Sequence, residues 1–207
     1  MIAAVMQQFK KPSGWVGKRL VGPFLNVFHA PLHELYLDTI DVQTENKILE
    51  IGFGTGRLLA RMAALAKRAV VSGVDYSEDM LQEAQRRNRD LIAQNRMELR
   101  LGDLARLDYP DACFDTVCTA NTVYYWPDPV NNVREMARVL RPGGKLVVAF
   151  RTTAFARFRH AQLGFTWYSV AQVKAILAEA GLVHIESRQR PLIRPPCCVV
   201  VARKAVA

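Results

Sequence analysis

Apolar residues along the chain follow two alternating spacings. Short apolar runs of strand length, such as KILEI at 47–51, alternate with segments in which apolar residues recur every three or four positions, as on one helix face. Strands that alternate with helices are typical of a largely parallel α/β sheet covered by helices. The pattern predicts helices over 31–40, 57–67, 78–94, 129–140 and 169–181 and strands over 47–51, 69–74, 97–101, 114–119, 182–190 and 197–202, with a further strand that ends at Phe150.

The first thirty residues follow neither spacing. Glycine and proline interrupt the apolar residues between 12 and 24, so neither a helix nor a strand is expected there. We interpret 1–30 as an N-terminal arm that folds over the ligand-binding end of the sheet and brings Trp15 to the substrate. A terminus packed on the outside of the sheet is the alternative. The remaining 31–207 are predicted to form a single domain, because 207 residues leave little room for two cores.

Three glycines at alternate positions follow the strand at 47–51. Glycine permits a sharp turn and lets a ligand approach main-chain N–H groups, and parallel sheets bind ligands at the carboxyl ends of their strands. The dinucleotide fingerprint G-x-G-x-x-G fails here, because Arg57 and Leu59 stand where its last glycine belongs. A plain structural turn is the alternative to a ligand loop. The E-x-G-x-G-x-G segment comprises Glu50, Gly52, Gly54 and Gly56.

Three segments at successive strand ends resemble the first three motifs of class I S-adenosylmethionine-dependent methyltransferases. They are KILEIGFGTGRLL, GVDYSEDML and the step Gly102-Asp103-Leu104. The resemblance implies that the glycine loop holds the methionine part of the cofactor and that Asp75 accepts both ribose hydroxyls. It also implies that Tyr76 and Met80 flank the adenine, that Asp103 accepts the adenine amino group and that the main chain next to it, at Leu104, donates to the ring. Ser77 is expected to cap the following helix.

The fourth strand ends in ANTVYYWPDP, where the resemblance places the methyl acceptor. Asn121 is a candidate for orienting the cofactor or acceptor, with capping of the strand end as the alternative. N-T-V-Y lacks both prolines of the N-P-P-Y pattern of base-methylating enzymes, which disfavours a nucleic-acid base as acceptor. Tyr124, Tyr125 and Trp126 offer an aromatic wall for a cation, although two of the three are expected in the core. The candidate catalytic residues are Tyr124, Tyr125 and His160, and the candidate substrate contacts are Trp15, Tyr125, Trp126 and Arg151.

The string LRPGGKLVVAF resembles the small-molecule branch of the family, which methylates quinones, sterols and other metabolites. The enzymes typical of this branch are similar to those of ubiquinone and menaquinone biosynthesis (methyltransferase type 11). This resemblance implies a Rossmann-like, seven-stranded, mostly parallel sheet with a C-terminal antiparallel hairpin. It implies methyl transfer from S-adenosyl-L-methionine, giving S-adenosyl-L-homocysteine, to a small-molecule or lipid-like acceptor without a metal. Two alternatives are a phospholipid head-group N-methyltransferase at the membrane surface and a non-catalytic cofactor-binding regulator.

Composition and charge narrow the location and the partners. No apolar run approaches the ~20 residues of a membrane span, and the opening segment carries its charges after its apolar stretch, so a cytoplasmic protein is expected. The four cysteines have no zinc-ligand spacing and are predicted to be reduced thiols. From Arg151 onward nine Lys/Arg face two acidic residues, within a net charge of +9. This excess is compatible with peripheral contact with an anionic membrane, and a solvated basic surface is the alternative. Nucleic acid is disfavoured, and nothing indicates the oligomeric state.

Overall fold

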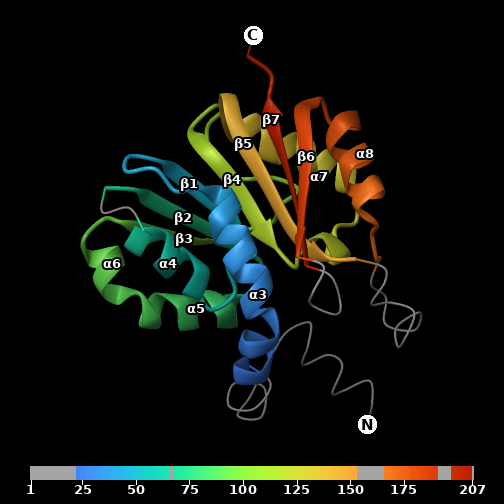
Figure 1. Cartoon of the computed structure of the whole chain (residues 1–207). Coiled ribbons are helices and arrows are strands. Elements are labelled where there is room, and N and C mark those ends of the chain that lie inside the picture. Colours follow the sequence, from blue (N-terminus) through green and yellow to red (C-terminus); the bar gives the residue numbers. More distant parts are fainter. Residues whose placement is uncertain (1–21, 66–67, 153–165, 191–196, 207) are drawn as a thin grey trace.

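The computed structural model describes residues 22–65, 68–152, 166–190 and 197–206. Its centre is a seven-stranded sheet with the order β3-β2-β1-β4-β5-β7-β6 (Figure 1). The first five strands are parallel, and β7 runs antiparallel between β5 and β6. The strands are β1 (Lys47–Ile51), β2 (Val70–Asp75), β3 (Met97–Leu101), β4 (Phe114–Ala120), β5 (Leu140–Arg151), β6 (Leu182–Arg190) and β7 (Cys197–Lys204). The predicted fold class is confirmed.

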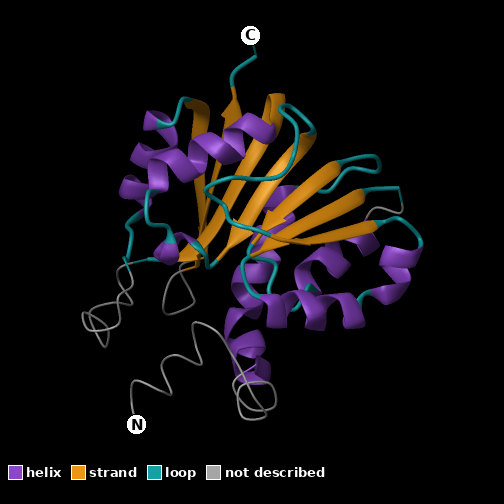
Figure 2. Cartoon of the chain, turned by 180° about the vertical axis from the view of Figure 1, so that it is seen from behind, coloured by secondary structure: helices purple, strands orange, loops and turns teal. Residues whose placement is uncertain are grey.

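Helices cover both faces of this sheet (Figure 2). One hydrophobic cluster joins the sheet to α3 (Gly22–Ile40), α4 (Arg57–Leu65), α5 (Glu78–Arg87) and α6 (Arg89–Ala93). A second joins the opposite face to α7 (Pro129–Val139) and α8 (Val170–Glu179). A short 3₁₀ turn, η2 (Val123–Tyr125), follows β4.

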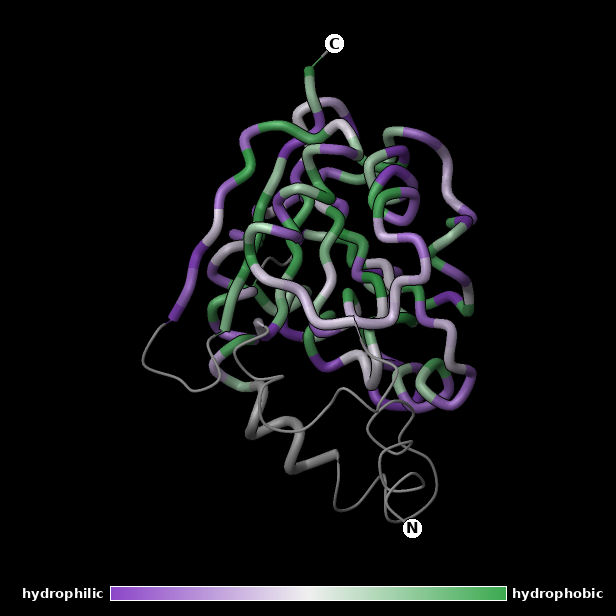
Figure 3. Tube along the Cα trace, turned by 90° about the vertical axis from the view of Figure 1, so that its right-hand side faces the viewer, coloured by the Kyte–Doolittle hydropathy of each residue, from purple (hydrophilic) through white to green (hydrophobic). Residues whose placement is uncertain are grey.

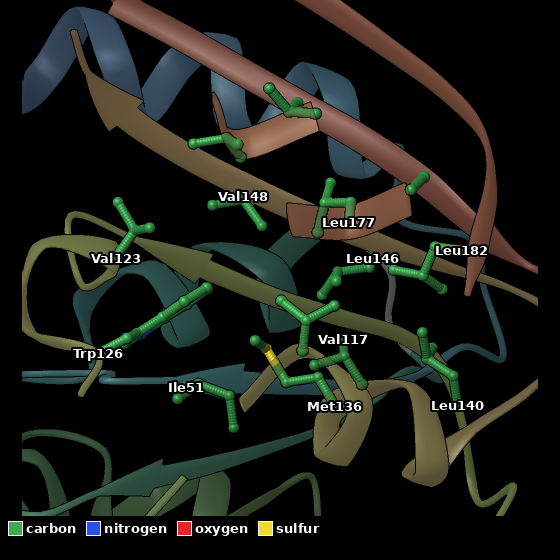
Figure 4. Close-up of a cluster of buried hydrophobic side chains, with 14 of the residues drawn as sticks. Ile51, Val117, Val123, Trp126, Met136, Leu140, Leu146, Val148, Leu177 and Leu182 are labelled. Atoms are coloured by element: carbon green, nitrogen blue, oxygen red, sulfur yellow. The ribbon is translucent and has the colours of Figure 1, made fainter. Parts of the chain in front are cut away.

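Alternation along the central strands divides the core between these two faces. In β1, Leu49 and Ile51 point to the α7 and α8 side, whereas Ile48 packs on the α3 side. Figure 4 shows the first side, with Ile51 beside Met136 of α7. Apolar segments accordingly run through the middle of the chain trace in Figure 3. Because successive strand residues face opposite ways, Glu50 lies on the α3 side.

Helix α3 begins earlier than its sequence pattern predicts. It starts at Gly22 and continues through Pro31, whereas the pattern placed 22–30 in an irregular arm. The prediction was wrong here, because Pro31 does not end the helix, whose later part is anchored on the sheet by the buried Leu32 and Tyr36. The rest of the expected arm, 1–21, lies outside the described residues.

The helix predicted over 78–94 is divided at Asn88. This residue leaves helical geometry, with φ −111° and ψ 21°, and ends α5 while preceding α6. Its side-chain Nδ2 donates to the carbonyl oxygens of Ala84 at 2.9 Å and Gly56 at 3.4 Å. A contact with the glycine loop, distant in sequence, therefore sets this break.

The predicted proline–glycine turn before the fifth strand is an irregularity inside β5. Phe114 of β4 pairs with Leu140, but Thr116 pairs with Lys145, so the intervening β5 residues loop out of the ladder. Gly143 has φ +75° there, a conformation that favours glycine. The strand thus starts before the turn and ends at Arg151.

The cysteines are free thiols, as predicted, with Cys113 half-buried and the other three buried. Over the residues that the structure describes, no helix has the length and apolar character needed to cross a membrane. The same residues contain no group of three or more His, Cys, Asp or Glu side chains arranged for a metal ion.

Candidate functional site

The glycine loop turns from β1 into α4 with positive φ at all three glycines. The values are +71° at Gly52, +55° at Gly54 and +71° at Gly56. A Cβ at Gly52 would lie 2.4 Å from Cγ2 of Thr122, and one at Gly56 would lie 2.5 Å from Nδ2 of Asn88. At Gly54 a Cβ would meet nothing within 4 Å. Two glycines thus allow close packing, while the middle one presents bare main chain to open space.

Asp75, the last residue of β2, is bonded directly to this loop. Its Oδ2 accepts a hydrogen bond from the Gly54 N–H at 2.9 Å, and its Oδ1 accepts one from the Ser77 N–H at 2.9 Å. The side chain is buried, and a carboxylate oxygen can accept more than one hydrogen bond.

Ser77 precedes α5 but does not cap it as predicted. The Ser77 hydroxyl is buried and makes no cap hydrogen bond, and within the described part of the chain it has no hydrogen-bond partner. Its main chain serves instead, because its N–H is committed to Asp75.

Glu50 is enclosed on the α3 side of the sheet. The Tyr36 hydroxyl of α3 donates to its Oε1 at 3.5 Å, while Oε2 has no hydrogen-bond partner among the described residues. Burial and the nearby charge of Asp75 raise the pKa of Glu50 well above its ordinary value. A buried carboxyl with one unsatisfied oxygen is costly, and a cationic ligand group beside it would remove that cost.

The ends of β2 and β3 form a partly exposed apolar surface next to Asp75. Tyr76 is 64% exposed, and Leu101, the register partner of Asp75, is 52% exposed. Met80 and Leu104 are half-buried. Sequence reasoning missed Leu101, because an apolar residue that ends a strand has no local signature to separate it from the core.

Asp103 follows β3 with an exposed side chain. Its Oδ1 accepts a hydrogen bond from the Ala105 N–H at 2.9 Å. The turn is closed by a main-chain bridge between Asp103 and Arg106. The carboxylate is therefore oriented by its own loop and stays accessible to a ligand.

The segment after β4 separates its aromatic residues into different environments. Asn121 has φ +59°, and its N–H donates to the Ala149 carbonyl at 2.8 Å. Trp126 is buried in the core beside Val123 (Figure 4). Tyr124 is also in that core, whereas Tyr125 is 41% exposed. Two of the three aromatic residues thus belong to the core, as expected, and Tyr125 is the one with a face toward solvent.

The hydroxyl of Tyr124 is engaged with the end of β5. It accepts a hydrogen bond from the Arg151 N–H at 2.6 Å and donates to the Arg151 carbonyl at 3.2 Å. Burial raises the pKa of Tyr124 above its ordinary range. Burial and the neighbouring Tyr76 raise the pKa of Tyr125 to about 12. Neither phenol is poised to accept a proton near neutral pH.

One of the remaining candidates is buried, and two lie outside the described residues. Arg151 is buried at the carboxyl end of β5, and Trp15 and His160 lie outside the described residues. Tyr36, His33 and Arg57 stand at the same edge of the sheet and were not among the sequence candidates. The sequence offered a signal for Arg57, because no acidic residue stands near it on the predicted helix. It offered none for Tyr36, which looks like any apolar helix position.

Comparison with known proteins gives this edge a context. A family model described as "Methyltransferase domain" matches residues 49–148. A phosphatidylethanolamine N-methyltransferase of Cereibacter sphaeroides is 34% identical over 151 residues, which cover 68% of this chain and 71% of that protein. A 27-O-demethylrifamycin SV methyltransferase of Amycolatopsis mediterranei is 34% identical over 109 residues, which cover 53% of this chain and 40% of that protein.

A solved structure shares the whole fold. The SAM-dependent methyltransferase from Aquifex aeolicus has a TM-score of 0.72 at 19% identity, with 97% of each chain covered. At that identity the likeness concerns the fold alone.

The residues present fit the cofactor that the sequence motifs imply. Its methionine ammonium matches the buried oxygen of Glu50 that lacks a partner among the described residues, and its ribose hydroxyls match the carboxylate acceptors of Asp75. The open side of Gly54 leaves space for the methionine chain.

Proposed function

Because the chain belongs to the S-adenosylmethionine-dependent methyltransferases and is thus an enzyme, we propose that it methylates the amine nitrogen of an ethanolamine phosphate head group. The observation that carries this choice is the 34% identity to a phosphatidylethanolamine N-methyltransferase over 68% of the chain. The methyl group comes from S-adenosylmethionine, and S-adenosylhomocysteine is the second product.

The cofactor lies across the carboxyl ends of β1, β2 and β3 in this proposal. Glu50 takes the methionine ammonium, Gly52, Gly54 and Gly56 make room for the methionine chain, and Asp75 takes the ribose. Asp103 accepts the adenine amino group, and Asn121 borders the sulfonium. Tyr76, Met80 and Leu104 supply the apolar contacts of the adenine ring. The exposed ring of Tyr76 is available for such a contact.

Methyl transfer proceeds by in-line displacement. The lone pair of the neutral amine forms the new N–C bond, the S–C bond breaks, its electron pair returns to sulfur, and the product amine releases a proton to water. The protein contributes alignment and exclusion of water, because the sulfonium already activates the methyl group. The exposed face of Tyr125 stabilises the cationic nitrogen by about 0.5 to 2 kcal/mol.

A lipid acceptor requires contact with a membrane surface. The basic excess after Arg151 would draw the protein to anionic lipid, which brings the head group to the carboxyl edge of the sheet. Binding to anionic vesicles should therefore weaken as salt rises.

The test uses purified protein, S-adenosylmethionine labelled in the methyl group, and vesicles of phosphatidylethanolamine with phosphatidylglycerol. N-methylated phosphatidylethanolamine, detected by mass spectrometry, supports the proposal. Vesicles of phosphatidylcholine and phosphatidylglycerol are the control, because their head group has no free amine. The proposal would be overturned if neither vesicle yields labelled lipid while a phenolic or quinol acceptor is methylated.

A hydroxyl-bearing metabolite is the second candidate acceptor. The relative from Amycolatopsis mediterranei, whose name describes an O-methylation, favours it. A hydroxyl acceptor must lose its proton, so its methylation should accelerate steeply with pH until the hydroxyl ionises. Transfer to a phenol panel but not to ethanolamine phosphates would select this candidate.

A further inference from the structure

Basic side chains converge on the α3 side of the same carboxyl edge. Arg57 and Arg61 stand one turn apart on α4, and both Arg61 guanidinium nitrogens bond the two oxygens of Glu34 on α3, at 2.8 and 3.1 Å. This contact turns that face of α4 toward α3, which lies next to it in Figure 1. His33 of α3 lies close enough to this junction for the charges of Arg61 and Arg57 to act on it.

Arg151 approaches the junction from the sheet. Val147 and Ala149 of β5 pack on the α3 side, and the alternation of a strand places the Arg151 side chain on that side too. The Tyr124 hydroxyl fixes its main chain through two hydrogen bonds. Arg151 is also buried, so its guanidinium lies within the protein at the end of β5.

Among the described side chains at this junction, positive charges outnumber negative ones. Glu34 neutralises Arg61, but Arg57 has no hydrogen bond or ion pair within the described ranges. Burial, followed by the charges of Arg61, Arg57 and Arg151, lowers the pKa of His33 to about 4. Like charges held together in a partly buried place are unfavourable, and an anion bound among them reverses that energy.

We propose that Arg57, His33 and Arg151 form a subsite for the phosphate group of the methyl acceptor. This inference rests on the proposed function, because it assigns residues to the head group named there. Guanidinium groups hold phosphate oxygens through paired, charge-assisted hydrogen bonds, which suits Arg57 at the rim and Arg151 at the base. The subsite and the glycine loop meet at the first residue of α4, so a phosphate held here keeps its amine near the cofactor.

Direct binding tests the subsite without any methyl transfer. Inorganic phosphate is titrated against the full chain at constant ionic strength set with potassium chloride, and the thermal midpoint is followed. We expect phosphate to raise the midpoint of the wild type and of Arg134→Gln, which removes the same charge from the opposite face. Arg57→Gln and His33→Gln should weaken phosphate binding at least tenfold. An equal response of Arg57→Gln and Arg134→Gln would overturn the subsite.

The cofactor carboxylate is the competing anion. The dissociation constants of S-adenosylmethionine and of methylthioadenosine, which lacks the carboxylate, are measured for both variants. We expect Arg57→Gln to change neither constant more than twofold. A tenfold loss confined to S-adenosylmethionine would assign the junction to the methionine carboxylate and overturn the proposal.

Two sources of the phosphate are separated by kinetics. With phosphatidylethanolamine vesicles and with soluble phosphoethanolamine, Arg57→Gln should raise KM at least tenfold for whichever source is methylated and leave kcat within threefold. If phosphate binds through Arg57 but neither acceptor is methylated, the proposed function fails while the phosphate subsite stands. If both are methylated with an unchanged KM, the subsite fails while the function stands.

Discussion

Oδ2 of Asp75 accepts a hydrogen bond from the main-chain N–H of Gly54 at 2.9 Å, across 21 positions of sequence. The bond ties the end of β2 to the glycine loop after β1. The residue proposed to hold the ribose therefore also shapes the loop proposed to hold the methionine chain. Pre-organisation of this kind lowers the entropic cost of binding the cofactor.

Asp75→Asn tests this double role. The amide has one acceptor oxygen for two main-chain N–H donors, so either Gly54 or Ser77 loses its partner. We expect about 1 to 3 kcal/mol lower stability in urea unfolding and at least tenfold weaker S-adenosylmethionine binding by calorimetry. Asp103→Asn, at an exposed carboxylate, should leave stability unchanged. Wild-type stability and affinity in Asp75→Asn would contradict the assignment.

Gly54 and Gly56 should respond differently to alanine. At Gly56 the new Cβ collides with Asn88 and Ala84 and φ is unfavourable, so Gly56→Ala should lose about 2 to 4 kcal/mol of stability. Gly54→Ala carries only the backbone cost of about 1 to 2 kcal/mol, because its Cβ points into open space. Its main effect should be on the dissociation constant of S-adenosylmethionine. A Gly54→Ala variant as unstable as Gly56→Ala would show that the space is occupied by protein.

Glu50→Gln should be more stable than the wild type at high pH and bind the cofactor worse. The folded-state pKa of Glu50 is raised, so its contribution to stability is complete below its unfolded pKa and is lost as pH rises through the folded value. Glutamine does not titrate. Unfolding at pH 5 and pH 8 should thus show an advantage of the variant that grows with pH.

The same variant cannot offer an anion to the methionine ammonium. Its S-adenosylmethionine affinity should fall at least tenfold, with methylthioadenosine affinity unchanged. Tyr36→Phe is the matched change at the other end of the hydrogen bond, and it should also lower the affinity for S-adenosylmethionine, but by less. An identical pH dependence in wild type and Glu50→Gln would rule out the buried, titrating carboxyl.

His33 should give stability the opposite dependence on pH. Its folded pKa of about 4 lies below the ordinary 6.5, because burial and Arg61, Arg57 and Arg151 outweigh Glu34. The unfolded chain therefore binds more protons, and stability falls as pH decreases from 6.5 toward 4. His33→Gln should remove part of this decline when unfolding is measured at pH 7 and pH 5. A decline of the same size in both proteins would mean that the pKa of His33 is not lowered at this junction.

The parallel sheet and the proposed cofactor-binding edge could be predicted from local sequence. Apolar runs, glycines and strand-end acids are short-range signals, and the glycines and Asp75 meet at this edge because parallel strands end together. The break at Asn88 escaped prediction because it depends on the Gly56 carbonyl, and the early start of α3 escaped it because the helix continues through Pro31.

The same short-range signals do not predict the environment of the side chains. The sequence placed Glu50 in the ligand loop but held no sign that Tyr36, from a helix before β1, would enclose it. The junction of His33, Arg57 and Arg151 joins three elements, and none of these residues has a distinctive neighbour in sequence. Contacts between elements, rather than the pattern within one, decide such sites.

Methylation of phosphatidylethanolamine is tested most directly by the phospholipid profile of a bacterial host that makes this lipid but none of its N-methylated forms. The full chain is expressed there, and the lipids are analysed by mass spectrometry beside cells that express Asp75→Asn. We expect N-methylated phosphatidylethanolamine with the wild type and at least a tenfold loss with the variant. Unmodified phosphatidylethanolamine in cells whose purified wild-type protein binds S-adenosylmethionine would contradict this expectation.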